Sequence, residues 1–266
     1  MNAMNVLLHR LGQATTAFLY VFLLAPLVFV VVVSLNGGPV PSFPPRDLSF
    51  KWYAVALQSE NFMGGLVTST WLALAAAVIA VPIGVAAAFG LSRGNWRGKA
   101  ALEAFFLSQL IVPGIVIGIA VRVALAGMDF ATAPVRLLLG HTLIVLPYTV
   151  RTVLASLARM DPSLEEAGRV FGASRWQVLW HVTLPQLRGS IAAGAILSFI
   201  LSFDDVSVSL FLSSAQTTTL PIAIMSYMQY NFDPSIAAIS ALLILATLGG
   251  ALAVERFFGL KKILGS

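Results

Sequence analysis

The chain has 266 residues, of which 58% are hydrophobic and only 10% are charged, with a formal net charge of +5 and a mean hydropathy of +0.90. So apolar a composition excludes an ordinary soluble domain and indicates an integral membrane protein. The absence of cysteine excludes disulfides and thiolate sites, and the basic residues are scattered among apolar runs rather than gathered into a nucleic-acid-binding patch.

Apolar runs long enough to cross a bilayer occur six times. A hydrocarbon core of about 30 Å needs about 20 helical residues at 1.5 Å each. The predicted spans cover residues 17–35, 66–91, 102–126, 135–157, 189–212 and 235–257. The first run exceeds the apolar core of a signal peptide, about 7 to 15 residues, so we expect it to be retained. The sequence therefore predicts an all-α membrane protein in which residues 1–266 form a single transmembrane domain.

The distribution of basic residues between the predicted spans indicates the orientation. Only Arg46 and Lys51 lie in one set of alternate connections. The other set contains Arg10, Arg93, Arg97, Lys99, Arg159, Arg169, Arg175, Arg188, Arg256, Lys261 and Lys262. Because basic residues are retained on the cytoplasmic side, we predict that both termini face the cytoplasm, together with a polar segment at 161–185.

The second, third and fourth predicted spans contain small residues and prolines. Ala76, Ala80, Gly84 and Ala88 recur at every fourth position, which predicts close approach of another helix. Three further residues, Pro113, Gly114 and Pro147, interrupt the third and fourth spans, as either broken helices beside a wet cavity or simple kinks.

The polar segment 161–185 begins with signals for a short helix. Asp161 is a suitable N-cap with Pro162 at the first helical position, and Glu165 and Glu166 place negative charge where the helix dipole favours it. Gly172 then permits a sharp turn.

A second short helix is predicted after this turn. Ser174 and Gln177 have the spacing of a capping box, and Pro185 is expected to end the helix. Two exposed amphipathic helices suit either a docking surface for a partner protein or a position on lipid headgroups.

The sequence EAGRVFGASRWQVLWHVTLP, 166–185, resembles the cytoplasmic signature of permease subunits in ATP-binding-cassette (ABC) importers. That signature is Glu-Ala-Ala, three residues, Gly, nine residues, Ile, one residue and Leu-Pro, with Gly168 and Val182 replacing the third Ala and the Ile here. The resemblance implies the six-helix, methionine-permease-like fold of type I importers and a coupling helix that fits into a separate ATPase. The residues to which it assigns this coupling are Glu165, Glu166, Ala167, Gly168, Gly172, Ser174, Leu184 and Pro185.

Two later stretches, LSFILSFDDVSVSLFLSS at 197–214 and the Leu-Pro loop that follows, resemble the second permease of spermidine/putrescine importers. This resemblance implies a bacterial inner-membrane permease for a polyamine, with two ATPase copies, a second homologous permease and an extracytoplasmic solute-binding protein as partners. The alternatives are another small amine-bearing or zwitterionic solute, such as an aminophosphonate or amino-acid-like compound, and a membrane anchor that does not transport.

No catalytic constellation is found in the sequence, so we expect that the chain is not an enzyme. GNWRGKA, 94–100, has three residues between its glycines where a phosphate-binding loop has four, and Ala where Ser or Thr would bind Mg²⁺. His9, His141 and His181 are too far apart in the predicted topology to share a metal ion. We therefore expect no cofactor in this chain, with ATP and Mg²⁺ bound by the partner ATPase.

Two carboxylates in the fifth predicted span need an explanation, because insertion of Asp at a helix centre costs roughly 2.5 to 3.5 kcal/mol. On a continuous helix, Asp205 shares a polar face with three serines, whereas Asp204 lies about 100° away. One hypothesis is a wet path for a cationic solute; the alternative is a structural ion pair with Arg122 or Arg136. On the fourth span, a histidine and a tyrosine seven residues apart either meet the solute or bond a neighbouring helix. The candidate path residues are Asp205, Asp204, Ser202, Ser198, Ser209, His141 and Tyr148.

Overall fold

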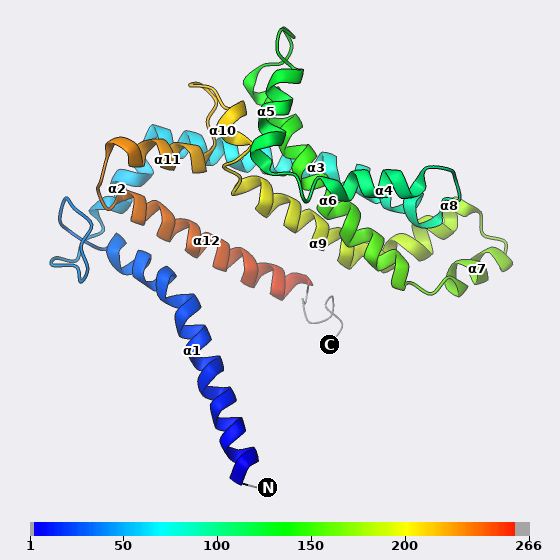
Figure 1. Cartoon of the computed structure of the whole chain (residues 1–266), viewed down its shortest axis with the longest axis horizontal. Helices are drawn as coiled ribbons and strands as arrows, with labels where there is room; N and C mark the ends of the chain where they lie inside the picture. The colour runs from blue at the N-terminus through cyan, green and yellow to red at the C-terminus, as the bar shows by residue number, and fades with distance from the viewer. Residues whose placement is uncertain (1–2, 259–266) are drawn as a thin grey trace. The chain divides into compact units, whose positions relative to one another are not determined.

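The computed structural model describes residues 3–258, and the predicted all-α fold class is confirmed over that range (Figure 1). The helices are α1 Ala3–Ser34, α2 Lys51–Gln58, α3 Glu60–Arg93, α4 Lys99–Ser108, α5 Gly114–Ala124, α6 Ala133–Arg159, α7 Ser163–Val170, α8 Arg175–Val178, the π-helical turn η1 Leu179–Thr183, α9 Leu184–Phe203, α10 Ser209–Leu212, α11 Leu220–Tyr230 and α12 Ser235–Phe258. Lys261 and Lys262, which entered the prediction of orientation, lie outside the described residues.

Within the described residues the chain forms two compact units, one containing residues 3–63 and 224–258, the other residues 64–223. In the first unit, α1 and α2 pack against α12, and the ring of Phe62 lies 5.0 Å from that of Tyr227. The apolar helix α1 is almost fully exposed within the chain, with 6% of its most apolar window buried. Its surface is therefore suited to lipid or another subunit.

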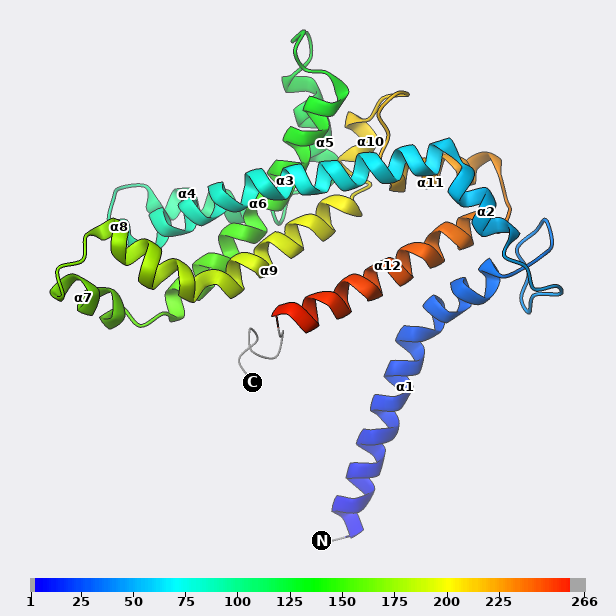
Figure 2. The ribbon, with the colours of Figure 1, turned by 180° about the vertical axis from the view of Figure 1, so that it is seen from behind.

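The second unit is built around α6, which packs along α9 and against α3 (Figures 1 and 2). The predicted close approach at the small residues of α3 is confirmed: Ala76, Ala80 and Ala88 are fully buried. A Cβ on Gly84 would lie 2.7 Å from Thr149 Cγ2 of α6. Only glycine permits this separation of the two helices.

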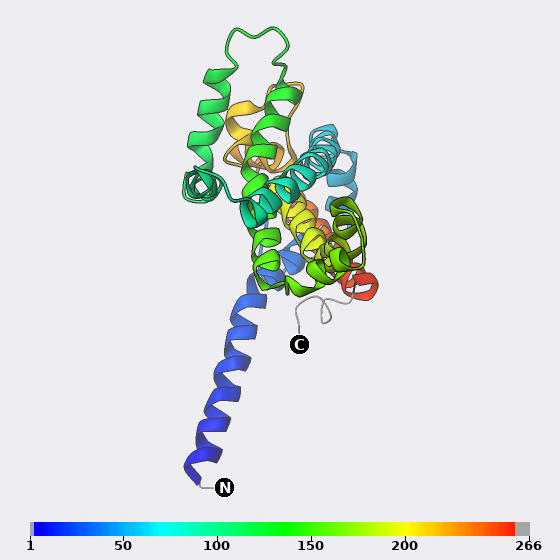
Figure 3. The ribbon, with the colours of Figure 1, turned by 90° about the vertical axis from the view of Figure 1, so that its right-hand side faces the viewer.

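The two prolines of the middle spans have different effects. Pro113 caps α5 after the chain has left α4 at Ser108, so residues 102–126 form two helices instead of one. By contrast, Pro147 lies inside α6, which bends but continues to Arg159 (Figures 1 and 2). The first proline therefore produces a broken helix, and α5 returns to the start of α6 through a short loop (Figure 3).

Within the described residues, five helices are long and apolar enough to cross a membrane: His9–Ser34, Glu60–Arg93, Ala133–Arg159, Arg175–Phe203 and Ser235–Ala253. They overlap five of the predicted spans. The third predicted span is the exception, because α4 has 10 residues and α5 has 11, or about 15 and 17 Å at 1.5 Å per residue. The count of six spans is not confirmed.

Two predicted helix ends are wrong. Pro185 does not end the helix that begins after Ser174, because η1 precedes it and the chain continues into α9. A π turn widens the backbone, which accommodates a ring that would otherwise clash with the preceding turn. The fifth span does not remain helical to Leu212, because Asp205 Oδ2 accepts hydrogen bonds from the N–H groups of Val208 at 3.0 Å and Ser209 at 2.9 Å and so begins α10.

Candidate functional site

The polar segment between α6 and α9 forms a compact elbow. Asp161 Oδ1 accepts a hydrogen bond from the Ser163 N–H at 2.9 Å, and this bond holds the pKa of the exposed Asp161 carboxyl below its ordinary value. Helix α7 begins at Ser163, one residue after the predicted position at Pro162. The turn after α7 is made by Gly172, whose φ of +85° favours glycine.

The predicted capping box at the start of α8 is confirmed. Ser174 Oγ accepts from the Gln177 N–H at 3.3 Å, and Gln177 Oε1 accepts from the Ser174 N–H at 2.7 Å. Close packing also fixes α7 against α8, since a Cβ on Gly168 would lie 3.2 Å from Val178 Cγ2. The elbow is therefore held by backbone geometry and caps as well as by side-chain contacts.

Several large apolar side chains of the elbow are exposed within the described chain. Val170 is 85% exposed, Phe171 90% and Trp176 71%. Glu166 and Ala167 of α7 are also exposed. We call these five residues the coupling surface: Glu166, Ala167, Val170, Phe171 and Trp176. Three large apolar side chains exposed within so short a segment indicate a surface for a partner. Leu184 is half-buried and Pro185 exposed at the start of α9.

Glu165 differs from Glu166, because it is buried. Its Oε1 lies 3.1 Å from Nη2 of Arg93 at the end of α3 and accepts a hydrogen bond from Thr183 Oγ1 of η1 at 3.1 Å. Arg169 lies 3.9 Å from its other oxygen. Glu165 thus faces its own chain, where it joins three helical elements.

Neither Arg93 nor Thr183 was identified from the sequence as a partner of Glu165. Arg93 is 72 positions away, so no local spacing pairs the two residues. The local signal at Arg93 is the basic end of a long apolar run before a short loop, a pattern that indicates orientation and not an ion pair.

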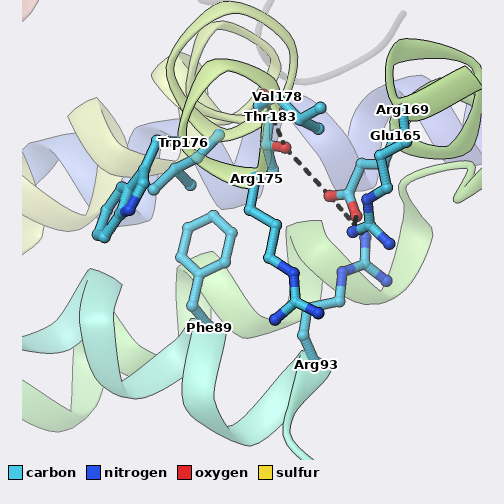
Figure 4. A pocket seen from close by; sticks show the side chains of 9 residues that line it. Phe89, Arg93, Glu165, Arg169, Arg175, Trp176, Val178 and Thr183 are labelled. Carbon is cyan, nitrogen blue, oxygen red and sulfur yellow. Dashed lines mark hydrogen bonds and ion pairs between the residues drawn. The ribbon is translucent and has the colours of Figure 1, made fainter. Parts of the chain in front are cut away.

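A pocket of about 430 Å³ lies between the end of α3 and the elbow (Figure 4). Its lining residues are Phe89, Arg93, Glu165, Arg169, Arg175, Trp176, Val178, Leu179 and Thr183. The side chains drawn in Figure 4 converge from α3 on one side and from α7, α8 and η1 on the other.

A second polar cluster lies where α6 meets α9 and α10. His141 is fully buried; its Nδ1 lies 2.8 Å from Ser202 Oγ and its Nε2 lies 3.0 Å from Ser209 Oγ. Asp205 Oδ2 lies 3.9 Å from the same Nε2. Nearby, Thr149 Oγ1 lies 3.1 Å from Ser198 Oγ. These residues converge on α6 even though the continuous helical face predicted for the serines and Asp205 is wrong.

The alternative ion pair of the two aspartates with Arg122 or Arg136 is also wrong within the described residues. Arg122 Nη1 donates instead to the Phe211 carbonyl at 3.0 Å, and Arg136 donates to the Ala131 carbonyl. The Asp205 carboxylate instead accepts hydrogen bonds from backbone N–H groups at the start of α10.

Asp204 and Tyr148 have no partners of this kind among residues 3–258. Asp204 is exposed just after the last turn of α9, and its carboxylate makes no hydrogen bond or ion pair there. Tyr148 is half-buried on α6, and its hydroxyl makes no hydrogen bond in the described part of the chain. In the same range, no three His, Asp or Glu side chains lie close enough together to bind a metal ion.

Comparison with known proteins gives concordant results along the chain. The chain is 29% identical over 230 residues to the spermidine/putrescine transport system permease protein PotC of Escherichia coli K12, covering 86% of this chain and 87% of PotC. It is 30% identical over 232 residues to the putrescine transport system permease protein PotI of the same organism, covering 85% of this chain and 82% of PotI.

The fold is that of a solved bacterial ABC transporter involved in the import of alginate, with a TM-score of 0.75, 15% identity and coverage of 97% and 99% of the two chains. The model of the family described as "binding-protein-dependent transport system inner membrane component" matches residues 80–259. The chain therefore belongs to this family of ABC importer permeases of the bacterial inner membrane.

Proposed function

We propose that this chain is the permease subunit of an ABC importer that moves a polyamine into the cytoplasm. The observation that carries the proposal is the coupling surface, which is exposed, largely apolar and joined to the end of α3 through the neighbouring buried Glu165. Such a surface in a chain of this family fits a separate ATPase, which binds ATP and Mg²⁺. The other partners are a second homologous permease and an extracytoplasmic solute-binding protein, and two ATPase copies serve the permease pair.

The elbow is connected to the helices in two ways. Through α8 and η1 it runs without a loop into α9, and through the Glu165–Arg93 contact it is joined to the end of α3. A displacement of the coupling surface by the ATPase is therefore transmitted to both helices. Packed helices transmit displacement because protein interiors are dense and only slightly compressible.

Two observations support a polyamine as the solute: the polyamines in the names of PotC and PotI, and a carboxylate near the break between α9 and α10. Asp205 is occupied with backbone N–H groups and lies beside His141. Asp204 is exposed, and its carboxylate has no partner in the described chain. A carboxylate that is not already paired is available to attract an ammonium group. Asp204 is thus the better-placed carboxylate of the pair for a cationic solute.

Orientation follows from the distribution of basic residues. Both termini and the elbow face the cytoplasm, because the connections on that side contain most of the Lys and Arg residues. The break between α9 and α10 then lies toward the opposite side, from which the binding protein delivers solute.

The test is ATP-dependent uptake by proteoliposomes that contain the permeases, the ATPase and the binding protein. We expect uptake of radiolabelled putrescine or spermidine to require ATP, with little competition from a zwitterionic amino acid or an aminophosphonate. Asp204→Asn should lower uptake about tenfold or more, equivalent to about 1.4 kcal/mol. Asp129→Asn, which removes an exposed carboxylate from the loop between α5 and α6, is the matched control and should leave uptake unchanged.

The outcomes separate the parts of the proposal. ATP-driven uptake of the zwitterion alone would contradict the polyamine but leave the permease in place. Failure of the ATPase to co-purify, together with no ATP-dependent uptake of any solute, would contradict the permease function and favour a membrane anchor.

A further inference from the structure

The pocket beside the elbow contains more positive charge than its own carboxylate can balance. Arg93, Arg169 and Arg175 line it together with Glu165, so three positive charges face one negative charge. The Glu165 carboxylate is already engaged by Arg93, Arg169 and Thr183. Arg175 makes no ion pair and no side-chain hydrogen bond within residues 3–258 (Figure 4).

The chemistry of these groups selects a class of ligand. A guanidinium offers several N–H donors in a fixed plane and binds phosphate or carboxylate oxygens through paired hydrogen bonds. In Figure 4 the guanidinium groups of all three arginines lie around the same space. A tetrahedral oxyanion placed there can accept from more than one arginine, which a single surface arginine cannot provide.

The rest of the lining is apolar. Phe89 and Trp176 stand on one side of the pocket, and Val178 and Leu179 also contribute to its wall (Figure 4). Apolar walls reduce the screening of charge by water, which strengthens the attraction between arginine and anion. A volume of about 430 Å³ is in the range of sites for small organic ligands. The pocket therefore suits a phosphate group that is attached to a small organic part.

We propose that Arg93, Arg169 and Arg175 form a binding site for a phosphate group, supplied by either an anionic phospholipid headgroup or a soluble phosphate compound. A bound phosphate would bridge α3 and α8. It would thus connect the elbow to the end of α3 in addition to the Glu165–Arg93 contact. The site goes beyond the proposed transport function, because it does not depend on which solute is carried.

The experiment uses the complete transport complex in detergent micelles and the fluorescence of Trp176, which lies in the pocket wall. Trp176→Phe identifies the contribution of this residue among the tryptophans of the complex, of which this chain has five. One arm titrates short-chain phosphatidylglycerol against zwitterionic phosphatidylcholine. The other titrates inorganic phosphate and glycerol phosphate. We expect a saturable Trp176 signal in one of the arms.

Two variants of matched charge test the assignment to the pocket. Arg175→Gln should weaken binding about tenfold or more, because it removes the charge and the paired N–H donors that a phosphate accepts from. Arg188→Gln removes the same charge from an exposed position of α9 that does not line the pocket, and it should leave the affinity within a factor of about two, as for surface changes away from a site.

Each result decides the proposal. Saturation by phosphatidylglycerol alone identifies a lipid headgroup, and saturation by phosphate or glycerol phosphate identifies a soluble ligand; both support the site. Absence of saturable binding in both arms, or equal affinities for the two variants, overturns it. So does loss of the ATPase from the Arg175→Gln complex with unchanged affinity for phosphate, because Arg175 would then be a protein contact.

Discussion

Gly172 shows how one residue determines the shape of the elbow. Its φ is +85°, and no atom lies within 4 Å of the position that a Cβ would take, so a side chain there meets backbone strain but no steric clash. Because a left-handed conformation costs a non-glycine residue about 1 to 2 kcal/mol, we expect Gly172→Ala to alter the elbow and lower the yield of ATPase that co-purifies with the permease.

The control for Gly172→Ala is Gly127→Ala. Gly127 has a φ of +79° and equally open surroundings, but it lies in the loop between α5 and α6. The same strain is therefore introduced outside the elbow. Equal losses of ATPase from the two variants would show that general destabilisation, and not the shape of the elbow, is responsible.

Two adjacent carboxylates have separable roles. Glu165 is buried against Arg93, whereas Glu166 is exposed. Glu165→Gln should lower the free energy of unfolding by about 1 to 3 kcal/mol, because hydrogen bonds to charged groups are lost or weakened. Glu166→Gln should leave stability within about 0.5 kcal/mol but reduce the stimulation of ATPase activity by solute-loaded binding protein.

Thermal unfolding and ATPase assays on the same purified complexes measure these two effects. A Glu166→Gln complex that unfolds as readily as Glu165→Gln would contradict the division of roles. Restoration of stability in the charge-swapped pair Arg93→Glu with Glu165→Arg would add direct support, since neighbouring residues in one ion pair are expected to couple in a double-mutant cycle.

Among the helices, His141 of α6 holds the segment between α9 and α10 in place by hydrogen bonds to both of its ends. It contacts Ser202 at the end of one helix and Ser209 at the start of the other, and it is fully buried. His141→Ala would leave a cavity and two serine hydroxyls without this partner. We expect a loss of about 3 kcal/mol or more in the free energy of unfolding, measured by thermal unfolding of the complex.

His181→Ala is the matched change at an exposed position. In the described structure the one hydrogen bond of the His181 ring is to the Gln177 carbonyl of its own turn. Its loss should change stability by no more than about 0.5 kcal/mol. A small effect of His141→Ala, similar to that of His181→Ala, would mean that α6 does not hold the break.

The same elements show what local sequence patterns could and could not predict. The capping box at Ser174, the turn at Gly172 and the small-residue face of α3 follow from spacing alone, and all three are present. The continuation through Pro185 was missed because a π turn has no distinctive local pattern. The fifth span was predicted to continue to Leu212 because hydropathy alone does not show that the Asp205 side chain accepts hydrogen bonds from the backbone and starts a new turn.

Contacts between distant residues were the main limit of prediction. The sequence singled out Glu165, His141 and Asp205, and the expected bond of His141 to a neighbouring helix is confirmed, but the sequence did not identify the partner residues. Their actual neighbours, including Arg93 across 72 positions and Ser202 across 61, depend on how α3, α6 and α9 pack. Composition and periodicity identify a polar residue that needs a partner; packing decides which partner it finds.

For the molecule as a whole, the number of spans determines whether the two termini lie on the same side of the membrane: an even number places them on one side and an odd number on opposite sides. Neither α4 nor α5 alone reaches across a bilayer core of about 30 Å. If the two cross in series, with Pro113 at the break, six crossings place both termini on one side. If they enter and return, five crossings place the termini on opposite sides. The charge distribution favours the first arrangement, because Arg93, Arg97 and Lys99 lie between the end of α3 and the start of α4, whereas only Arg122 and Arg136 flank the loop between α5 and α6.

Single cysteines distinguish these arrangements directly, since the chain contains none of its own. Asn95, before α4, and Thr132, after α5, are both exposed. In intact spheroplasts we expect a membrane-impermeant maleimide to label Thr132→Cys but to label Asn95→Cys only after permeabilisation. Gln216→Cys, in the loop before α11, should behave like Thr132→Cys, and Ser174→Cys in the elbow like Asn95→Cys. Labelling of the Asn95 and Thr132 variants from the same side would show that α4 and α5 return without crossing, because two positions that flank a complete crossing must face opposite sides.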